Sequence, residues 1–300
     1  MGALPSPKLL AALLLAACVG LSSEDGDLWS YEGDGPEHWS GKCKDGKHQS
    51  PIDLGSGGTV ESNFESLSFI NYNNIYNGNI TNNGHTIQLQ VTDISHNIML
   101  TGGGLNRVYS LAQIHFHWKS EHTINGKRYP LEVHFVHFEK RFKKVEDAVK
   151  VKGGIAVIGV MFEDKDSRNE IQVLDQVKDL RHDMKKNIKF SPASLLPHDT
   201  SKFYRYYGSL TTPGCDESVV WTVLSNSLPL SNKQISLFQK VTDSKGKFLL
   251  SNFRPLQKQN DRIVYFQSSP PHQVPYHSSA LSLKNSLSIM SSLLIVLKLK

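Results

Sequence analysis

Two short segments, QIHFHW at residues 113–118 and LEVHFVHF at residues 131–138, decide the fold. Both combine histidines with aromatic, β-branched and other apolar residues, a composition typical of buried β-strands. Side chains alternate between the two faces of a strand, so His115 and His117 are expected on one face of the first segment. If the two strands pair, His134 of the second segment can lie beside them. His137 falls on the opposite face from His134, and we interpret it as a structural histidine of the core.

Three imidazoles on one face indicate a metal site. Three neutral histidine ligands with one open position are typical of catalytic zinc. A metal-bound histidine usually donates its other ring N–H to an amide or carboxylate oxygen. Gln113 shares the face of His115 and His117, and Glu132 shares the face of His134. The sequence therefore predicts Zn²⁺ held by the three histidines, with Gln113 and Glu132 orienting the rings.

The N-terminal end has the composition of a targeting segment. Lys8 precedes an apolar run at residues 9–19 that is too short to cross a bilayer, and small residues follow it. This order is typical of a secretory signal peptide, which we place at residues 1–22. The same run contains LAAC at residues 15–18, which resembles a bacterial lipoprotein box, so lipidation of Cys18 is an alternative.

The C-terminal end resembles a lipid-attachment signal. A Pro/Ser-rich linker at residues 269–280 ends in small residues and is followed by an apolar tail within residues 281–300. This order is typical of a GPI signal, whose tail is removed. Lys298 and Lys300 are unusual in such a tail, so a short anchor or an unprocessed tail remains an alternative. We expect an extracellular protein, attached to the cell surface through GPI or otherwise secreted.

Charge and cysteine usage fit this processing. Removing both ends removes four lysines and no acidic residue, so the formal net charge falls from +5 to +1. Such a charge does not indicate a nucleic-acid partner. Cys43 and Cys215 are the cysteines that remain, and in an oxidising compartment they most simply form one disulfide. Asn79 begins a glycosylation sequon, which is a weak signal by itself.

Between the ends, residues 23–268 are expected to form a single mainly β domain. Apolar or alternating β-rich segments recur at residues 85–91, 111–118, 131–139, 155–162, 219–224 and 262–267. Two segments instead combine a capping box with apolar residues at helical spacing. They are Ser167 and Glu170 before Val173, Val177, Leu180 and Met184, and Ser231 and Gln234 before Leu237, Phe238 and Val241. The pattern predicts a central sheet with short peripheral helices.

Other enzyme classes fit the histidines less well. HxH followed by Glu121 also begins a cupin metal motif, but a cupin needs a Pro-x-Gly-x-x-His arrangement, and no glycine separates Pro130 from His134. A helical HExxH metalloprotease motif and a GxSxG nucleophile elbow are both absent from the sequence.

From about Trp29 to Gln267 the chain resembles the α-class carbonic anhydrases. Besides the two histidine strands, the resemblance rests on GPEHW at 35–39, QSPI at 49–52, NNGH at 82–85, SLTTP at 209–213 and NFRP at 252–255. The family implies a large, twisted, mostly antiparallel sheet and a conical cleft with zinc at its floor. The implied activity is reversible hydration of carbon dioxide to bicarbonate and a proton by a zinc hydroxide nucleophile. Inhibitory anions and sulfonamides are further expected ligands.

The resemblance also assigns roles to single residues. It makes His115, His117 and His134 the zinc ligands, and His85 the proton shuttle. Thr211 would accept the proton of the nucleophile and donate its own to Glu121, while Thr211 and Thr212 would meet bicarbonate or an inhibitory anion. An apolar wall for carbon dioxide is implied at Val136, Val157, Leu210, Val219 and Trp221.

Two departures from many cytosolic members bear on the branch of the family. Gly214 and Cys215 follow the Thr-Thr-Pro motif, which with Cys43 resembles the secreted or GPI-anchored branch and its single disulfide. Gln88 stands where an asparagine is frequent, which affects rate tuning and not the reaction. A zinc-free binding module of the same fold is the alternative to an enzyme. Such members typically lose a ligand histidine, and this chain keeps all three, so we expect an active zinc lyase.

Overall fold

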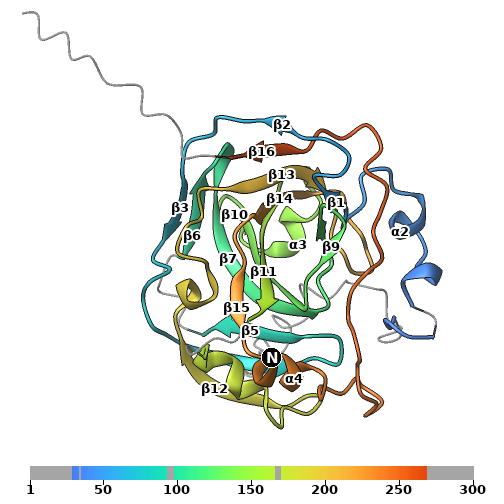
Figure 1. Ribbon diagram of the computed structural model, residues 1–300, viewed down its shortest axis with the longest axis vertical. Coiled ribbons are helices and arrows are strands. Elements are labelled where there is room, and N and C mark those ends of the chain that lie inside the picture. The colour runs from blue at the N-terminus through green and yellow to red at the C-terminus, as the bar shows by residue number, and fades with distance from the viewer. Residues whose placement is uncertain (1–28, 34, 93–97, 166–169, 269–300) are drawn as a thin grey trace, which may run out of the picture. The chain divides into compact units, whose positions relative to one another are not determined.

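The computed structural model describes residues 29–33, 35–92, 98–165 and 170–268. The predicted signal peptide, linker and tail lie outside the described residues. The described residues form many strands and a few short helices (Figure 1). The strands are β1 (Asp53–Leu54), β2 (Val60–Glu61), β3 (Leu67–Ile70), β4 (Tyr76–Asn82), β5 (Ile87–Val91), β6 (Met99–Gly102), β7 (Leu105–Trp118), β8 (Thr123–Ile124), β9 (Lys127–Arg128), β10 (Leu131–Glu139), β11 (Ile155–Asp164), β12 (Lys185–Phe190), β13 (Phe203–Gly208), β14 (Val219–Leu224), β15 (Leu228–Leu230) and β16 (Tyr265–Gln267). The helices are η1 (Pro36–His38), α2 (Lys42–Asp45), α3 (Val145–Ala148), η2 (Gln172–Val177), η3 (Pro192–Leu195) and α4 (Asn232–Phe238), where η marks a 3₁₀ helix.

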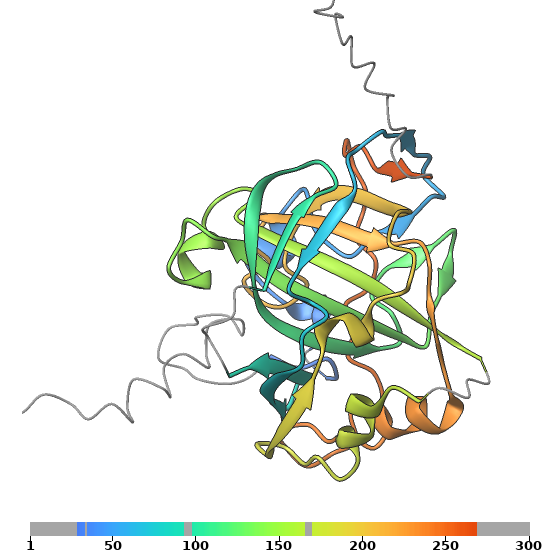
Figure 2. The same ribbon diagram turned by 90° about the vertical axis from the view of Figure 1, so that its left-hand side faces the viewer.

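One 13-stranded sheet dominates the domain. Its main path runs β12-β4-β5-β7-β10-β11-β14-β13-β16-β2, and most neighbours are antiparallel. The pairs β11–β14, β11–β15 and β16–β2 are parallel. Figures 1 and 2 show the twist of this sheet and the short helices outside it. The predicted mainly β domain with peripheral helices is confirmed.

The pairing of β7 with β10 brings the histidines together. His134 is the direct partner of His115, and Glu132 is the partner of His117. Directly paired residues share a face of the sheet, so the alternation expected from the sequence holds through this region. Beyond the pair Val136–Gln113, the register skips Ala112, and His137 pairs with Leu111. This extra residue in β7 is a β-bulge.

Both faces of the central strands are buried, each in its own apolar cluster. The cluster on the face of His134 includes Val136, Val157 and Trp221. The cluster on the opposite face includes Phe135 and Ile158. Burying a side chain of this size stabilises the fold by roughly 1.5–3 kcal/mol, which is why these strands read as almost continuous apolar runs.

The helix predicted after Ser231 is present as α4. Ser231 caps α4 as expected, since its Oγ accepts a hydrogen bond from the backbone N–H of Gln234. Phe238 is fully buried at the end of this helix. Val241 is also buried, but it lies beyond the helix.

The prediction of a helix that continues from Glu170 to Met184 is wrong. Only the 3₁₀ helix η2 forms there, and it ends at Val177. The chain turns at Asp179, which has a φ of 59°, so the helical spacing cannot continue. Leu180 is buried after this turn, whereas Met184 is 41% exposed. The capping residue Ser167 lies outside the described residues.

The strand boundaries were partly predictable. The bounds of β10 and β14 match the sequence prediction, and β11 extends two residues further. β7 begins earlier than expected, at Leu105, whereas β5 and β16 begin later, at Ile87 and Tyr265. His85 therefore lies in the turn before β5.

The predicted disulfide is confirmed. Cys43 of α2 is bonded to Cys215 in the segment between β13 and β14, with an S–S distance of 2.09 Å. Cys215 is fully buried, and Trp39 packs beside the bridge. Within the described ranges no helix has the length and apolarity needed to cross a membrane.

Candidate active site

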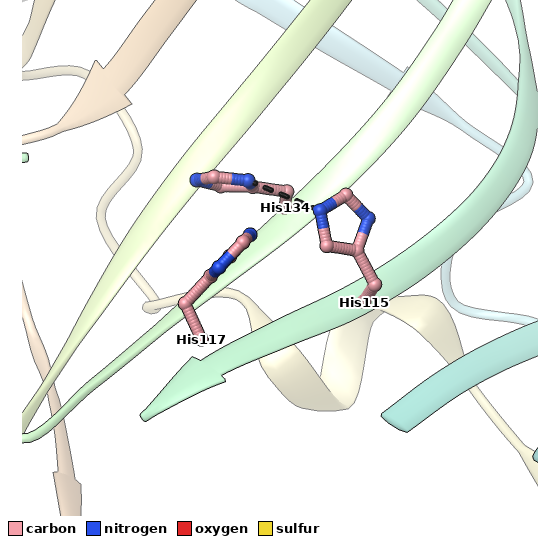
Figure 3. Close-up of side chains that lie close together, drawn as sticks. All are labelled: His115, His117 and His134. Atoms are coloured by element: carbon pink, nitrogen blue, oxygen red, sulfur yellow. Dashed lines mark hydrogen bonds between the residues drawn. The ribbon is translucent and has the colours of Figure 1, made fainter. Parts of the chain in front are cut away.

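Three histidine rings converge on one side of β7 and β10. The ring centroids of His115 and His117 lie 5.0 Å apart, and that of His134 lies 5.1 Å from the first and 4.6 Å from the second. Figure 3 shows the three rings turned toward one another from the two strands. One nitrogen from each ring lies within 4.8 Å of the others, a spacing that allows a common metal ion.

The outward nitrogen of each ring is held by a hydrogen-bond acceptor. His115 Nδ1 donates to Gln113 Oε1 at 2.9 Å, and His134 Nε2 donates to Glu132 Oε1 at 2.7 Å. Both orienting residues are those predicted from the sequence. His117 Nδ1 instead donates to the backbone carbonyl of Asn252 at 2.6 Å. These bonds fix the tautomers, so the remaining nitrogens carry lone pairs.

The remaining nitrogens face inward. His134 Nδ1 lies 3.3 Å from His115 Nε2, the contact drawn as a dashed line in Figure 3. His117 Nε2 is buried and has no hydrogen-bond partner in the described part of the chain. Glu121 Oε2 lies 3.4 Å from it and is also buried without a hydrogen-bond partner among the described residues.

This donor set fits a zinc ion. Leaving a buried polar atom unpaired costs about 1–3 kcal/mol, and a cation shared by three lone pairs relieves that cost. Burial, followed by the neighbouring His117 and His134, holds the pKa of His115 well below its ordinary value. Burial also lowers the pKa of His117, although Glu121 opposes the shift. The neutral imidazole favoured by these shifts is the form that binds metal.

Glu132 connects the site to a buried polar chain. Its Oε1 also accepts from His122 Nδ1 at 2.8 Å, and its Oε2 accepts from the His122 backbone N–H at 2.9 Å. The Tyr206 hydroxyl donates to His122 Nε2 at 2.6 Å and lies 2.9 Å from Ser50 Oγ. Burial opposes ionisation of Glu132, but the nearby His122 and His134 outweigh it and hold the pKa of Glu132 well below its ordinary value.

Glu121 and Thr211 lie close to the histidines. Glu121 is fully buried, and its Oε1 accepts from the backbone N–H of Arg254 at 2.9 Å. Thr211 is 5% exposed and lines the same cleft as the three histidines. Within the described residues Glu121 Oε2 makes no hydrogen bond, including to Thr211.

The histidines lie in a cleft of about 290 Å³. Most of the predicted cleft residues line it, namely His85, Gln113, Val136, Val157, Leu210, Thr211, Thr212 and Trp221. Val219 does not: its side chain is 1% exposed and packs in the apolar cluster behind the wall. Glu121 and Glu132 also lie behind the lining.

The cleft has further walls that sequence reasoning missed. Val145 and Glu146 of α3, followed by Val149 and Lys150, line one part. Trp29 lines another part and stacks on His85, with ring centroids 3.9 Å apart and planes at 9°. Neither α3 nor Trp29 carries a chemical signature in the sequence, so only the fold places them here.

Two other predicted positions lie away from the cleft. His137 is fully buried on the opposite face, where Nδ1 donates to the Ala156 carbonyl at 3.1 Å and Nε2 accepts from the Tyr72 hydroxyl. Its interpretation as a structural histidine is supported. Asn79 is 6% exposed in the middle of β4, where it is paired with Gln90 and Asn187. Such a position leaves little room for a glycan.

Comparison with known proteins identifies the family. Residues 34–268 match the model of the eukaryotic-type carbonic anhydrase family. A putative carbonic anhydrase 3 of Caenorhabditis elegans is 37% identical over 251 residues, covering 79% of this chain and 96% of the relative. Carbonic anhydrase 7 of Homo sapiens is 34% identical with the same coverage, and a carbonic anhydrase of Pectobacterium carotovorum is 35% identical over 86% of this chain and 98% of its own. The chain, with its three inward histidines at the floor of an apolar cleft, therefore belongs to the eukaryotic-type carbonic anhydrase family of lyases.

Proposed function

We propose that the chain catalyses the zinc-dependent, reversible hydration of carbon dioxide to bicarbonate and a proton. The observation that carries the proposal is the arrangement of the three histidines. Their outward nitrogens are bonded to Gln113, Asn252 and Glu132, and their inward nitrogens converge at the floor of the cleft. Three neutral ligands with an open fourth position are the donor set of catalytic rather than structural zinc.

When bound, the zinc ion acts as a Lewis acid that lowers the pKa of a water molecule to about 7, a value known from carbonic anhydrase itself. His115, His117 and His134 would hold the ion. Gln113 and Glu132 keep the rings in the tautomer that presents a lone pair to it.

Thr211 and Glu121 are proposed to orient the nucleophile. A hydroxyl that donates its proton to a carboxylate can then only accept a hydrogen bond from the attacking group. Glu121 Oε2 is buried and unpaired, so it is available as the acceptor for Thr211. The lone pair of the nucleophile is thereby directed at the carbon of the substrate.

The apolar wall suits a substrate without charge or hydrogen-bond donors. Val136, Val157 and Trp221 are buried on the zinc face and line the cleft beside Leu210. They would exclude water from the position of carbon dioxide, while Thr212, which also lines the cleft, can meet bicarbonate or an inhibitory anion. We propose sulfonamides as ligands of the same cleft.

His85 is proposed to carry the proton out of the cleft. Passing a proton from a group of pKa about 7 directly to water is uphill by roughly 12 kcal/mol, which limits turnover to ~10⁴ s⁻¹. A histidine of pKa about 6.5 makes the transfer nearly level. Its position in the cleft lining supports this role, and its ring stacks on Trp29.

The decisive test is carbon dioxide hydration by the zinc-loaded protein, compared with a His85→Ala variant. The variant should keep its zinc and lose turnover by about one to two orders of magnitude, the gap between the limit set by water and the ~10⁶ s⁻¹ known for carbonic anhydrase. Its kcat/KM should change little, because proton export follows the chemistry, and added imidazole should restore much of the loss. His198→Ala, at an exposed position outside the cleft, is the matched control. Equal turnover of the two variants in dilute buffer would exclude the shuttle, and an inactive zinc-loaded parent would exclude the function.

We further propose that the chain belongs to the secreted or GPI-anchored branch. The disulfide supports an oxidising compartment, and the terminal segments have the composition of a signal peptide and an attachment signal. Phosphatidylinositol-specific phospholipase C should release the protein from cells. A mature protein that still ends at Lys300 would rule out the anchor.

A further inference from the structure

A second pocket lies away from the zinc cleft, on the opposite face of the sheet. It has a volume of about 500 Å³ and is bounded by the first half of β7, the loop before β11, and parts of β13, β14 and β16. Tyr207 and Val220 are direct strand partners in its wall. Their neighbours Tyr206 and Trp221 face the zinc side, so side-chain alternation puts the two sites on opposite faces. We refer to this site as the back pocket.

The lining of the back pocket is rich in positive charge. Arg107, Lys152 and Arg262 all line it, and among the described lining residues Asp261 is the only acidic one. The Asp261 carboxylate is 85% exposed and lies 3.3 Å from the ring of His48.

These cations are incompletely neutralised. Arg107 lies 2.9 Å from Glu139, but the same carboxylate also binds Arg141 at 2.8 Å. Arg262 donates to the uncharged backbone carbonyls of Gln259, Lys258 and Tyr207, and Glu217 and Asp261 act on it without forming an ion pair within the described residues. Lys152 is exposed and makes no ion pair within the described residues.

A buried arginine next to the pocket adds to the field. Arg205 is 3% exposed, and on β13 it lies two residues from Tyr207 and opposite Tyr265 of β16, both of which line the pocket. Its guanidinium donates to the neutral hydroxyl of Thr222, at 3.0 Å from Nε and 2.8 Å from Nη2. No carboxylate of the described residues forms an ion pair with it. Glu65 acts on Arg205 only from beyond ion-pair distance, and burying a charge without a contacting counter-ion costs free energy, which an anion bound nearby reduces.

Tyrosine rings supply the remaining surface. Tyr207 is 45% exposed, and Tyr109 and Tyr265 lie beside it in the lining. The Tyr109 hydroxyl is committed to the carbonyl of Gly153 at 2.7 Å. An exposed aromatic ring beside several cations suits a ligand that has a flat or cyclic body as well as acidic groups.

We propose that the back pocket binds a polyanionic saccharide, a sugar carrying two or more sulfate or phosphate groups. Three cationic side chains in one lining, those of Arg107, Lys152 and Arg262, match several acidic groups on one ligand better than a single small anion. Arginine is suited to sulfate and phosphate oxygens because its planar fork can donate two hydrogen bonds at once. The volume lies within the range of small-molecule sites, about 300–1,000 Å³.

Calorimetric titration of the zinc-loaded protein tests the proposal, with a trisulfated heparin disaccharide and fructose 1,6-bisphosphate as separate probes. We expect at least one of them to bind with a Kd below about 1 mM, while its uncharged parent sugar does not. The probe that binds more tightly distinguishes a sulfated from a phosphorylated ligand. A sulfonamide that saturates the zinc cleft should leave this binding unchanged.

Lys152→Glu is the variant that reports on the pocket. It should weaken binding about tenfold or more, equivalent to at least about 1.4 kcal/mol, and leave carbon dioxide hydration as in the parent. Lys189→Glu is the matched control, because it makes the same charge change at an exposed position of β12 on the far edge of the sheet. Absence of binding by both probes, an equal loss in the two variants, or displacement by the sulfonamide would each overturn the proposal.

Discussion

His134 and His137 lie three residues apart on β10, and both are almost completely buried, yet their surroundings differ. Each donates one ring N–H to an oxygen, to Glu132 and to the Ala156 carbonyl respectively. The second nitrogen of His137 is satisfied by the Tyr72 hydroxyl, whereas that of His134 faces other imidazoles. Burial and one hydrogen bond therefore do not make a metal ligand. The surroundings of the second nitrogen differ between the two rings, and on this difference we propose His134, and not His137, as a zinc ligand.

The most direct way to test this contrast is to remove each ring. His134→Ala should lose tightly held zinc and nearly all hydratase activity, as should His115→Ala and His117→Ala, because two imidazoles remain where three are needed. His137→Ala should keep its zinc. It leaves the Tyr72 hydroxyl and the Ala156 carbonyl unpaired, which lowers the free energy of unfolding by about 1–3 kcal/mol for each group. Metal content per folded protein and activity are the measurements. The opposite pattern, with zinc lost only from His137→Ala, would mean that the strand faces are assigned wrongly.

The acid stability of the fold should sharpen the contrast further. Burial lowers the pKa of His137 to about 4 from an ordinary 6.5, so the unfolded chain binds a proton that the folded chain resists. His137 leaves the free energy of unfolding unchanged above pH 6.5 and lowers it progressively as the pH falls, by about 3 kcal/mol in all once the pH is below 4. Denaturant unfolding of the zinc-loaded parent and of His137→Gln should show this difference in slope. Parallel stability curves from pH 7 to 4 would contradict it.

Replacing Glu132, the partner of His134, should affect zinc binding, whereas replacing Tyr72, the partner of His137, should not. Glu132→Gln removes the charge that orients His134 and His122, and it should weaken zinc binding about 10–100-fold. Competition with a chelator measures the change. The variant should still bind one zinc ion per molecule at saturating zinc, since all three ligand nitrogens remain. Unchanged affinity would show that Glu132 serves only the buried chain through His122 and Tyr206.

The smallest expected effect belongs to Tyr72→Phe. It removes the hydroxyl that satisfies His137 Nε2 and should cost roughly 1–3 kcal/mol of unfolding free energy, since a buried acceptor is left unpaired. Zinc affinity and hydratase activity should match the parent. A loss of zinc in this variant would place His137 in the metal site after all.

The sequence predicted the face shared by the three histidines well, because strand alternation is a local property. His115, His117 and His134 follow from the period of two, and Gln113 and Glu132 follow from the same faces. The hydrogen bond from His117 could not be predicted, since its acceptor is the backbone carbonyl of Asn252, 135 residues later. A backbone carbonyl carries no sequence signature, and only the fold brings it there.

Helix length was less predictable than strand faces. The apolar spacing from Val173 to Met184 matches a helix, but the positive φ at Asp179 ends any helical continuation and Met184 is left exposed. Leu180 is buried through a turn instead. A capping box with an apolar stripe therefore predicts burial of the first residues more reliably than the length of the helix.

The bulge at Ala112 reverses the face of the sheet on which the odd-numbered residues of β7 lie. Odd-numbered residues from Gln113 onward face the zinc cleft, whereas Leu111 is paired with His137, so the odd-numbered residues before the bulge, including Tyr109, turn to the other face. Odd-numbered residues of β7 therefore line the cleft after the bulge and the back pocket before it. A substitution in one half of the strand leaves the pairing of the other half unchanged. Deleting Ala112 would be expected to remove the bulge, leave Leu111 opposite His137, and keep both Arg107 and the three histidines on their present faces.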